Sequence, residues 1–149
     1  QLCIVLSYQY YTYTPTVSNM KRYLVIVLLI PFLSFSQSVK EYFEKGSDYA
    51  KTGEYQLAID NFTECLRIDT NYALAYNMRG YTYYSLGNYE DAIADFTEFI
   101  GSGTDIADVY YNRGLAKQKA GLSFCSDYKK ACDLGKEECC KWHIEYNCK

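Results

Sequence analysis

The chain has 149 residues, of which 49% are hydrophobic, and it contains 18 tyrosines but only two prolines. This composition fits one packed domain and excludes a disordered, collagen-like or multi-span membrane protein. The formal net charge is −3, and no cluster of lysine and arginine is present. Because nucleic-acid binding needs clustered basic side chains to neutralise phosphates, we predict no nucleic-acid partner.

The amino-terminal part of the chain has the pattern of a secretory signal peptide. From Met20 it continues with two basic residues, an apolar stretch from Tyr23 to Ile30, and small residues that end at Ser36. An apolar core of about 7 to 15 residues suits a signal peptide, whereas a spanning helix needs about 18 or more. We predict a signal peptide over residues 20–36 and an exported protein, periplasmic or secreted, with no membrane span after cleavage. An uncleaved amino-terminal anchor is the alternative.

Residues 1–19 precede this signal and have neither helical periodicity nor charge. Because a signal peptide is recognised at the amino terminus, we expect translation to start at Met20. Residues 1–19 would then be a disordered extension of the gene model. The predicted domain, residues 37–149, has 13 Lys and Arg against 18 Asp and Glu, which gives it a net charge of −5.

A period of 34 residues runs through the predicted domain. Gly46, Gly80 and Gly114 are spaced 34 apart. The same interval relates Tyr42 to Tyr76 and Tyr110, Gly53 to Gly87 and Gly121, Tyr49 to Tyr83, Tyr55 to Tyr89, Ala58 to Ala92, and Phe62 to Phe96. A fixed period of this length indicates a repeat architecture in which each copy is one supersecondary unit.

Each copy is predicted to be a helical hairpin. Gly46 lies with two tyrosines at positions i, i+4 and i+7, on one face of a first helix. The apolar residues from Tyr55 to Leu66 follow helical spacing and define a second helix. Gly53 lies in the turn, where a positive φ has no steric cost for glycine. Because Gly46 and Ala58 are small residues on facing stripes, we expect the two helices to approach closely, with aromatic rings on either side.

These residues and their spacing resemble the tetratricopeptide repeat, a helix–turn–helix unit of about 34 residues. The resemblance implies an all-α fold, a right-handed superhelix of antiparallel helical hairpins with about seven helices. The units lie at about 39–72, 73–106 and 107–134, followed by a carboxy-terminal cap helix at about 137–147. The third copy loses two residues between its two helices, because Gly114 and Ala131 are 17 apart where Gly46 and Cys65 are 19 apart, so its second helix is expected to be modified. Terminal units differ from internal ones because they cap the stack.

Five of the seven cysteines follow Leu122. In an antiparallel hairpin that turns near Gly135, two pairs face each other: Cys125 with Cys148, and Cys132 with Cys139 or Cys140. Because export permits disulfides, we predict these two bridges. The sixth cysteine of the domain, Cys65, lies on an apolar stripe and is predicted to be a buried core residue without a redox role.

A metal site is the alternative explanation for the cysteine cluster. Cys139 and His143 are four residues apart on the predicted cap helix, and Cys132 is expected nearby. The C-x-x-C spacing of most zinc sites is absent, however, so we predict no metal and no cofactor. The chain also has a single histidine and neither a nucleophile motif nor a phosphate-binding glycine loop. We therefore predict that it is not an enzyme.

The first helix of each hairpin lines the concave side of such a stack, so the resemblance implies a partner groove there. The predicted groove positions are Phe43, Ser47, Lys51, Asn77, Tyr81, Tyr84, Tyr111, Asn112, Leu115 and Lys119. Aromatic rings offer contact area and amides bond the backbone of an extended peptide. Packing between repeats uses the same residue types, so we expect only part of this set to contact a partner.

The predicted function is therefore a non-enzymatic protein–protein interaction module or assembly scaffold that binds a protein or peptide in its groove. The alternatives are a structural subunit of a secreted or envelope complex, and a metal-binding protein. The cationic pattern with which some members of the family grip a carboxy-terminal carboxylate is incomplete in this sequence. We therefore do not expect a chaperone tail as the ligand.

Overall fold

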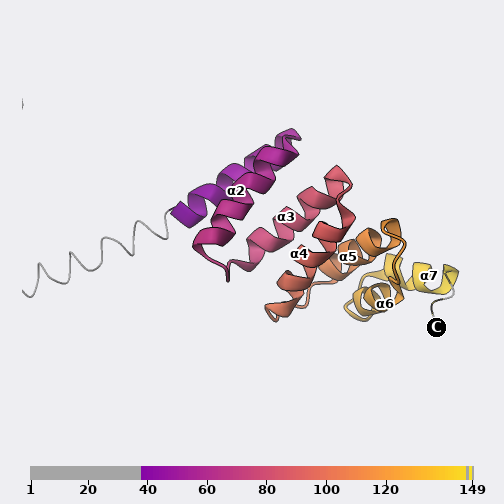
Figure 1. Cartoon of the computed structure of the whole chain (residues 1–149). Coiled ribbons are helices and arrows are strands. Elements are labelled where there is room, and N and C mark those ends of the chain that lie inside the picture. The colour runs from indigo at the N-terminus through magenta and orange to yellow at the C-terminus, as the bar shows by residue number, and fades with distance from the viewer. Residues whose placement is uncertain (1–37, 147, 149) are drawn as a thin grey trace, which may run out of the picture. The chain divides into compact units, whose positions relative to one another are not determined.

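Seven α-helices follow one another in the described part of the chain, residues 38–146 and 148 without the side chains of 143–145, and this part contains no strand. A helix over residues 38–52 is followed by α2 (Tyr55–Ile68), α3 (Ala73–Leu86), α4 (Tyr89–Gly101), α5 (Ala107–Lys119), α6 (Cys125–Asp133) and α7 (Glu137–Glu145). From α2 onward, each helix packs against the next (Figure 1). The predicted all-α helical repeat fold is confirmed, while the predicted segments 1–19 and 20–36 lie outside the described residues. No helix in the described part is both long and apolar enough to cross a bilayer.

The turns inside the hairpins share one backbone geometry. At Gly87, φ is 87°, and its N–H donates to the Tyr84 carbonyl at 3.0 Å. The N–H of Asn88 donates to the Tyr83 carbonyl at 2.9 Å. This pair of bonds is a Schellman motif, in which the left-handed residue ends the helix. Gly53 has the same geometry, with φ at 84°, so its predicted role in the turn is confirmed.

The helices of each hairpin meet where a glycine faces an aromatic ring. A Cβ built on Gly46 would lie 2.8 Å from the ring of Phe62, and one on Gly80 would lie 3.1 Å from the ring of Phe96. Both rings are fully buried. Real Cβ atoms rarely approach a neighbour this closely, so the helix spacing requires a residue without a side chain. The predicted close approach of the two helices is confirmed.

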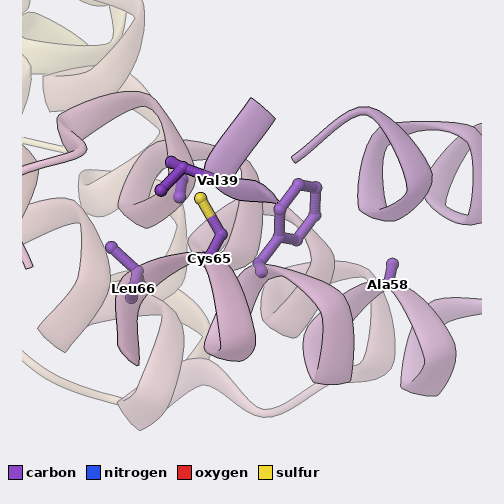
Figure 2. Close-up of a cluster of buried hydrophobic side chains, with 6 residues drawn as sticks. Val39, Ala58, Cys65 and Leu66 are labelled. Carbon is purple, nitrogen blue, oxygen red and sulfur yellow. The ribbon is translucent and has the colours of Figure 1, made fainter. Parts of the chain in front are cut away.

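The core of the first repeat gathers small and apolar side chains from the first three helices. Figure 2 labels Val39, Ala58, Cys65 and Leu66, which form one buried cluster with Phe62 and Ala75. Cys65 is completely buried and carries a free thiol. The prediction that it is a core residue is confirmed.

The buried thiol of Cys65 is expected to resist alkylation in the native protein. Burial raises the pKa of Cys65 to about 11. Because the thiolate is the reactive form, only about one thiol in a thousand is ionised at about pH 8. Iodoacetamide followed by mass spectrometry should label Cys65 only after denaturant is added, or as the pH approaches that pKa. Rapid labelling of the native protein at neutral pH would contradict the burial of this side chain.

The third repeat is modified at the start of its second helix. Tyr128 lies seven positions after Gly121, whereas Phe96 lies nine positions after Gly87. Tyr128 takes the place of the phenylalanine, because a Cβ on Gly114 would lie 2.5 Å from its ring. Accordingly α6 has 9 residues, against 13 in α4, and its first turn is missing. The expected modification of this helix is therefore a deletion at its amino-terminal end.

One arginine side chain, Arg79, forms an ion pair within its own repeat and a hydrogen bond to the preceding repeat. Arg79 on α3 donates from Nε and Nη2 to the carboxylate of Asp95 on α4, both at 2.8 Å. Its third nitrogen, Nη1, donates to the Thr63 hydroxyl on α2 at 2.9 Å. One guanidinium thus joins three helices. Burial raises the pKa of Asp95, and the hydrogen bonds from Arg79 oppose that rise.

The same arrangement recurs one repeat later. Arg113 donates from Nε and Nη2 to Asp127 at 3.1 and 2.6 Å, and from Nη1 to the Thr97 hydroxyl at 3.1 Å. Lys117 adds a second cation 2.7 Å from the Asp127 carboxylate. These contacts are not among the sequence predictions. Their signal is in the sequence, however, because Arg79 and Arg113 are themselves 34 residues apart.

Candidate functional site

Two neighbouring repeats form a pocket on their first helices. Tyr81 and Tyr84 from α3 and Asn112 and Leu115 from α5 line a hollow of about 170 Å³. The two helices contact each other directly, as the first helices of adjacent hairpins. All four lining residues belong to the predicted groove set, and none of them is charged.

An exposed apolar strip on α3 adjoins this pocket. Tyr81 is 55% exposed, and Leu74, seven residues earlier on the same helix, is 52% exposed. Residues seven apart lie on the same face of a helix, two turns from each other. Leu74 is not among the predicted groove positions, although its spacing from Tyr81 could have identified it. The groove face therefore extends along α3 beyond the pocket.

Two asparagine side chains on this face have no partner within the described part of the chain. Asn77 lies one turn from Tyr81 on α3, and Asn112 lies on α5 at the pocket. Both are half-buried, and neither side-chain amide forms a hydrogen bond with another described residue. A primary amide carries two donor hydrogens and a carbonyl acceptor, so each one can pair with both groups of a peptide bond.

The groove positions predicted in the first repeat are largely engaged inside the protein. The Phe43 ring packs against the rings of Phe62 and Tyr72, with centroids 5.8 and 5.2 Å away. The Ser47 hydroxyl donates to the Phe43 carbonyl of its own helix at 2.8 Å. Lys51 forms an exposed ion pair with a neighbour on the same helix. Phe43 therefore packs against the core of the first repeat. None of these three residues lines the pocket.

The groove position Tyr111 is covered by the carboxy-terminal helix. Its ring lies 5.9 Å from both the Tyr128 ring and the Trp142 ring of α7. The Lys136 ammonium lies 4.8 Å from the centroid of the Tyr111 ring. Burial raises the pKa of the Tyr111 hydroxyl. Lys119, by contrast, is exposed at the carboxy-terminal end of α5.

A larger hollow lies elsewhere, where the loop before α3 meets the end of α4. It has a volume of about 370 Å³ and is lined by Thr70, Asn71, Ala73, Tyr76, Glu98, Gly101 and Ser102. None of these residues is a predicted groove position. The smaller pocket is the candidate site because it combines exposed aromatic surface with unpaired amides, the features that bind an extended peptide.

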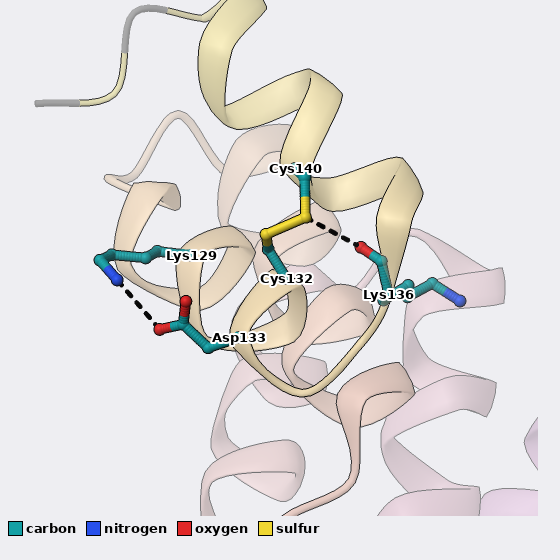
Figure 3. The surroundings of a disulfide bond; sticks show 5 residues. All are labelled: Lys129, Cys132, Asp133, Lys136 and Cys140. Atoms are coloured by element: carbon teal, nitrogen blue, oxygen red, sulfur yellow. Dashed lines mark hydrogen bonds and ion pairs between the residues drawn. A yellow bond between two sulfur atoms is a disulfide. The ribbon is translucent and has the colours of Figure 1, made fainter.

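Two disulfides join α6 to the end of the chain. Cys125 is bonded to Cys148, with their Cα atoms 5.3 Å apart. Cys132 is bonded to Cys140, with Cα atoms 5.0 Å apart (Figure 3). Of the two partners left open for Cys132, the structure has Cys140. The cap helix ends at Glu145, two residues before the predicted end, and the chain then brings Cys148 to Cys125.

Cys139, the other possible partner, is a buried free thiol in the structure. Burial raises its pKa, so the thiol is favoured over the thiolate. Because Cys132 is in a disulfide, it is not available to the alternative zinc site with Cys139. Among the described residues, no group of three or more His, Cys, Asp or Glu side chains is placed to hold a metal. The side chain of His143 lies outside the described residues.

Helical hairpins with a 34-residue period, each packed against the next, define the class of helical repeat proteins. Two sequence profiles described as tetratricopeptide repeat match residues 40–72 and 61–94. No curated protein matches the chain by sequence. The chain is a tetratricopeptide repeat protein.

Several solved structures are similar to this chain. MamA protein is 31% identical, with a TM-score of 0.62, and the match covers 64% of this chain and 54% of that one. The second TPR of Spaghetti (RPAP3), solved with the HSP90 peptide SRMEEVD, is 26% identical, with a TM-score of 0.62 and coverage of 66% and 93%. The Arabidopsis OM64 TPR domain is 19% identical, with a TM-score of 0.67 and coverage of 75% and 95%, a likeness of fold.

Proposed function

We propose that this protein is a non-enzymatic interaction module that binds an extended segment of another protein along α3 and α5. The observation that carries the proposal is the pocket shared by two neighbouring repeats, beside two unpaired asparagine amides. The second TPR of Spaghetti was solved with a peptide bound, which supports the same kind of partner for a similar fold.

Each part of the groove has a separate task in this proposal. The amides of Asn77 and Asn112 bond the peptide backbone, which gives affinity without sequence selectivity. The exposed surface of Leu74 and Tyr81 supplies apolar contact area, and the pocket receives one side chain of the ligand. Since the pocket lining is uncharged, selectivity rests on shape and apolar contact.

The partner segment is expected to be neutral and internal rather than an acidic carboxy terminus. The pocket offers no cation to a carboxylate. The two lysines among the predicted groove positions lie outside the pocket lining: Lys51 on the first helix pairs with Asp48, and Lys119 lies at the carboxy-terminal end of α5. A buried carboxylate without a cationic partner is costly, so a ligand such as SRMEEVD would bind poorly.

Tyr81→Ala is expected to weaken the binding of a groove ligand by about tenfold, or about 1.4 kcal/mol, because exposed tyrosines at the centre of a contact surface contribute strongly. Peptides selected from a phage-displayed library of random internal segments serve as probes, with affinity measured by fluorescence anisotropy. SRMEEVD is the comparison peptide.

Leu57→Ala is the matched control, because Leu57 is also exposed and apolar, at 43%, but lies on α2 outside the groove. It should leave the affinity unchanged. Equal loss in both variants, or selected peptides whose binding depends on a free carboxy terminus, would contradict the proposed groove. A complex with a single large protein that no isolated segment can replace would favour the structural-subunit alternative.

We also propose that the protein is exported after cleavage following Ser36. The two disulfides support this, since such bonds persist in oxidising compartments. Amino-terminal sequencing of the native protein should find Gln37 as its first residue. An intact mass that includes residues 20–36 would favour the anchored alternative.

A further inference from the structure

The carboxy-terminal helix α7 is joined to the rest of the protein at both of its ends by disulfides. Cys132 at the end of α6 is bonded to Cys140 in the first half of α7. Cys125 at the start of α6 is bonded to Cys148, which follows α7. With nine residues, α7 is too short to be a stable helix by itself. Its position therefore depends on these bonds and on its packing.

α7 packs against Tyr111, one of the predicted groove residues. The Trp142 ring lies 5.9 Å from the Tyr111 ring and 5.6 Å from the Tyr128 ring. Lys136, in the turn before α7, also contacts Tyr111, because its ammonium lies 4.8 Å from the centroid of that ring. The same ammonium pairs with Asp108 at the start of α5. The turn and α7 together cover Tyr111.

Tyr111 would otherwise continue the groove. It lies on α5 next to Asn112 and one turn before Leu115, two of the residues that line the pocket. An aromatic ring at this place would add to the apolar surface of Tyr81 and Tyr84 on α3. The cover over Tyr111 therefore determines where the groove ends.

Four of the five cysteines of this cap form the two disulfides, and the fifth is Cys139. Cys139, between Cys132 and Trp142 in the core, is completely buried. Burial keeps its thiol protonated, and a protonated thiol does not attack a disulfide.

We propose that the oxidation state of these two cysteine pairs sets the length of the groove. In the disulfide form, α7 covers Tyr111. In the dithiol form, α7 leaves α5 and Tyr111 joins the groove surface. Closing each pair removes two protons and two electrons from its thiols, and a disulfide-containing oxidant takes them up and becomes a dithiol. A dithiol reductant reverses the step. The consequence for partner binding rests on the proposed function, whereas the release of α7 does not.

Trp142 reports on this change directly because it is the single tryptophan of the chain. Reduction of the full-length domain with a dithiol should shift its emission to longer wavelength and increase quenching by acrylamide. Hydrogen exchange should show protection in α7 falling by about two orders of magnitude, the size expected when a disulfide loop of this length opens. Protection in α3 and α4 should be unchanged. None of these measurements uses a peptide. They therefore test the release of α7 separately from the binding of a peptide in the groove.

The quadruple variant Cys125→Ser, Cys132→Ser, Cys140→Ser, Cys148→Ser removes both disulfides and should show the reduced behaviour without any reductant. Cys139→Ala is the matched control, since it removes a cysteine but no disulfide, and its Trp142 emission should match that of the oxidised protein. Unchanged emission and exchange, in a sample that mass spectrometry shows to be fully reduced, would overturn the proposal. Loss of protection in α3 together with α7 would also overturn it, because α7 would then not respond as a separate unit.

Discussion

Replacing Phe96 by alanine is expected to lower the free energy of unfolding by about 4 kcal/mol. The ring is completely buried at the centre of the second hairpin, among Ala92, Phe99 and Val109. Its removal loses the transfer free energy of a phenyl group and leaves a cavity that the packed helices close only in part. Urea denaturation followed by circular dichroism measures the change.

Gly80→Ala provides the control for this prediction, because a Cβ there would lie 3.1 Å from the Phe96 ring. Alanine gains about 1 kcal/mol of helix propensity over glycine. In the protein with Phe96, the contact with the ring should cancel or reverse that gain. In the Phe96→Ala protein, the ring is absent and more of the gain should appear, because only the contact with the Asp95 Cβ at 3.2 Å remains. Equal effects of Gly80→Ala in both backgrounds would contradict the close approach as the reason for glycine.

Asp127→Ala is expected to lower the free energy of unfolding by about 3 kcal/mol. The Asp127 side chain is only 3% exposed and accepts from Arg113, while Lys117 lies within ion-pair distance. Its loss leaves two largely buried cations, Arg113 and Lys117, without their carboxylate partner and breaks the tie from α5 to α6. Thermal or urea unfolding measures the difference.

Asp133→Ala is the matched control, since Asp133 also lies on α6 and pairs with a lysine, but its side chain is 56% exposed. Exposed pairs of this kind are screened by water and contribute little. The control variant should therefore have nearly the same free energy of unfolding as the parent protein. A similar loss in both variants would show that the carboxylate of Asp127 does not act through burial.

The repeat architecture could be predicted because its determinants are local and periodic. The glycines at the hairpin turns and the small residues at the helix contact recur every 34 residues, and each has a steric reason that applies within one hairpin. The facing of Cys125 and Cys148 follows from the same antiparallel geometry, and these two residues are bonded in the structure.

The choice between Cys139 and Cys140 could not be predicted from the hairpin geometry. Adjacent residues on a helix point about 100° apart, and a shift of the register by one residue exchanges them. In the structure, Cys139 packs into the core beside Tyr128, and Cys140 on α7 faces and bonds Cys132 on α6.

By itself, the sequence determined the period, the hairpins and the class of protein, since spacing in the chain maps directly onto the faces of a helix. Only the tertiary structure decided which of the groove residues are free. Phe43 and Tyr111 belong to the same helix face as Tyr81, but contacts from Tyr72 and from Trp142 cover them. Those contacts come from elements distant in the sequence, and whether a side chain is covered depends on what the folded chain brings over it.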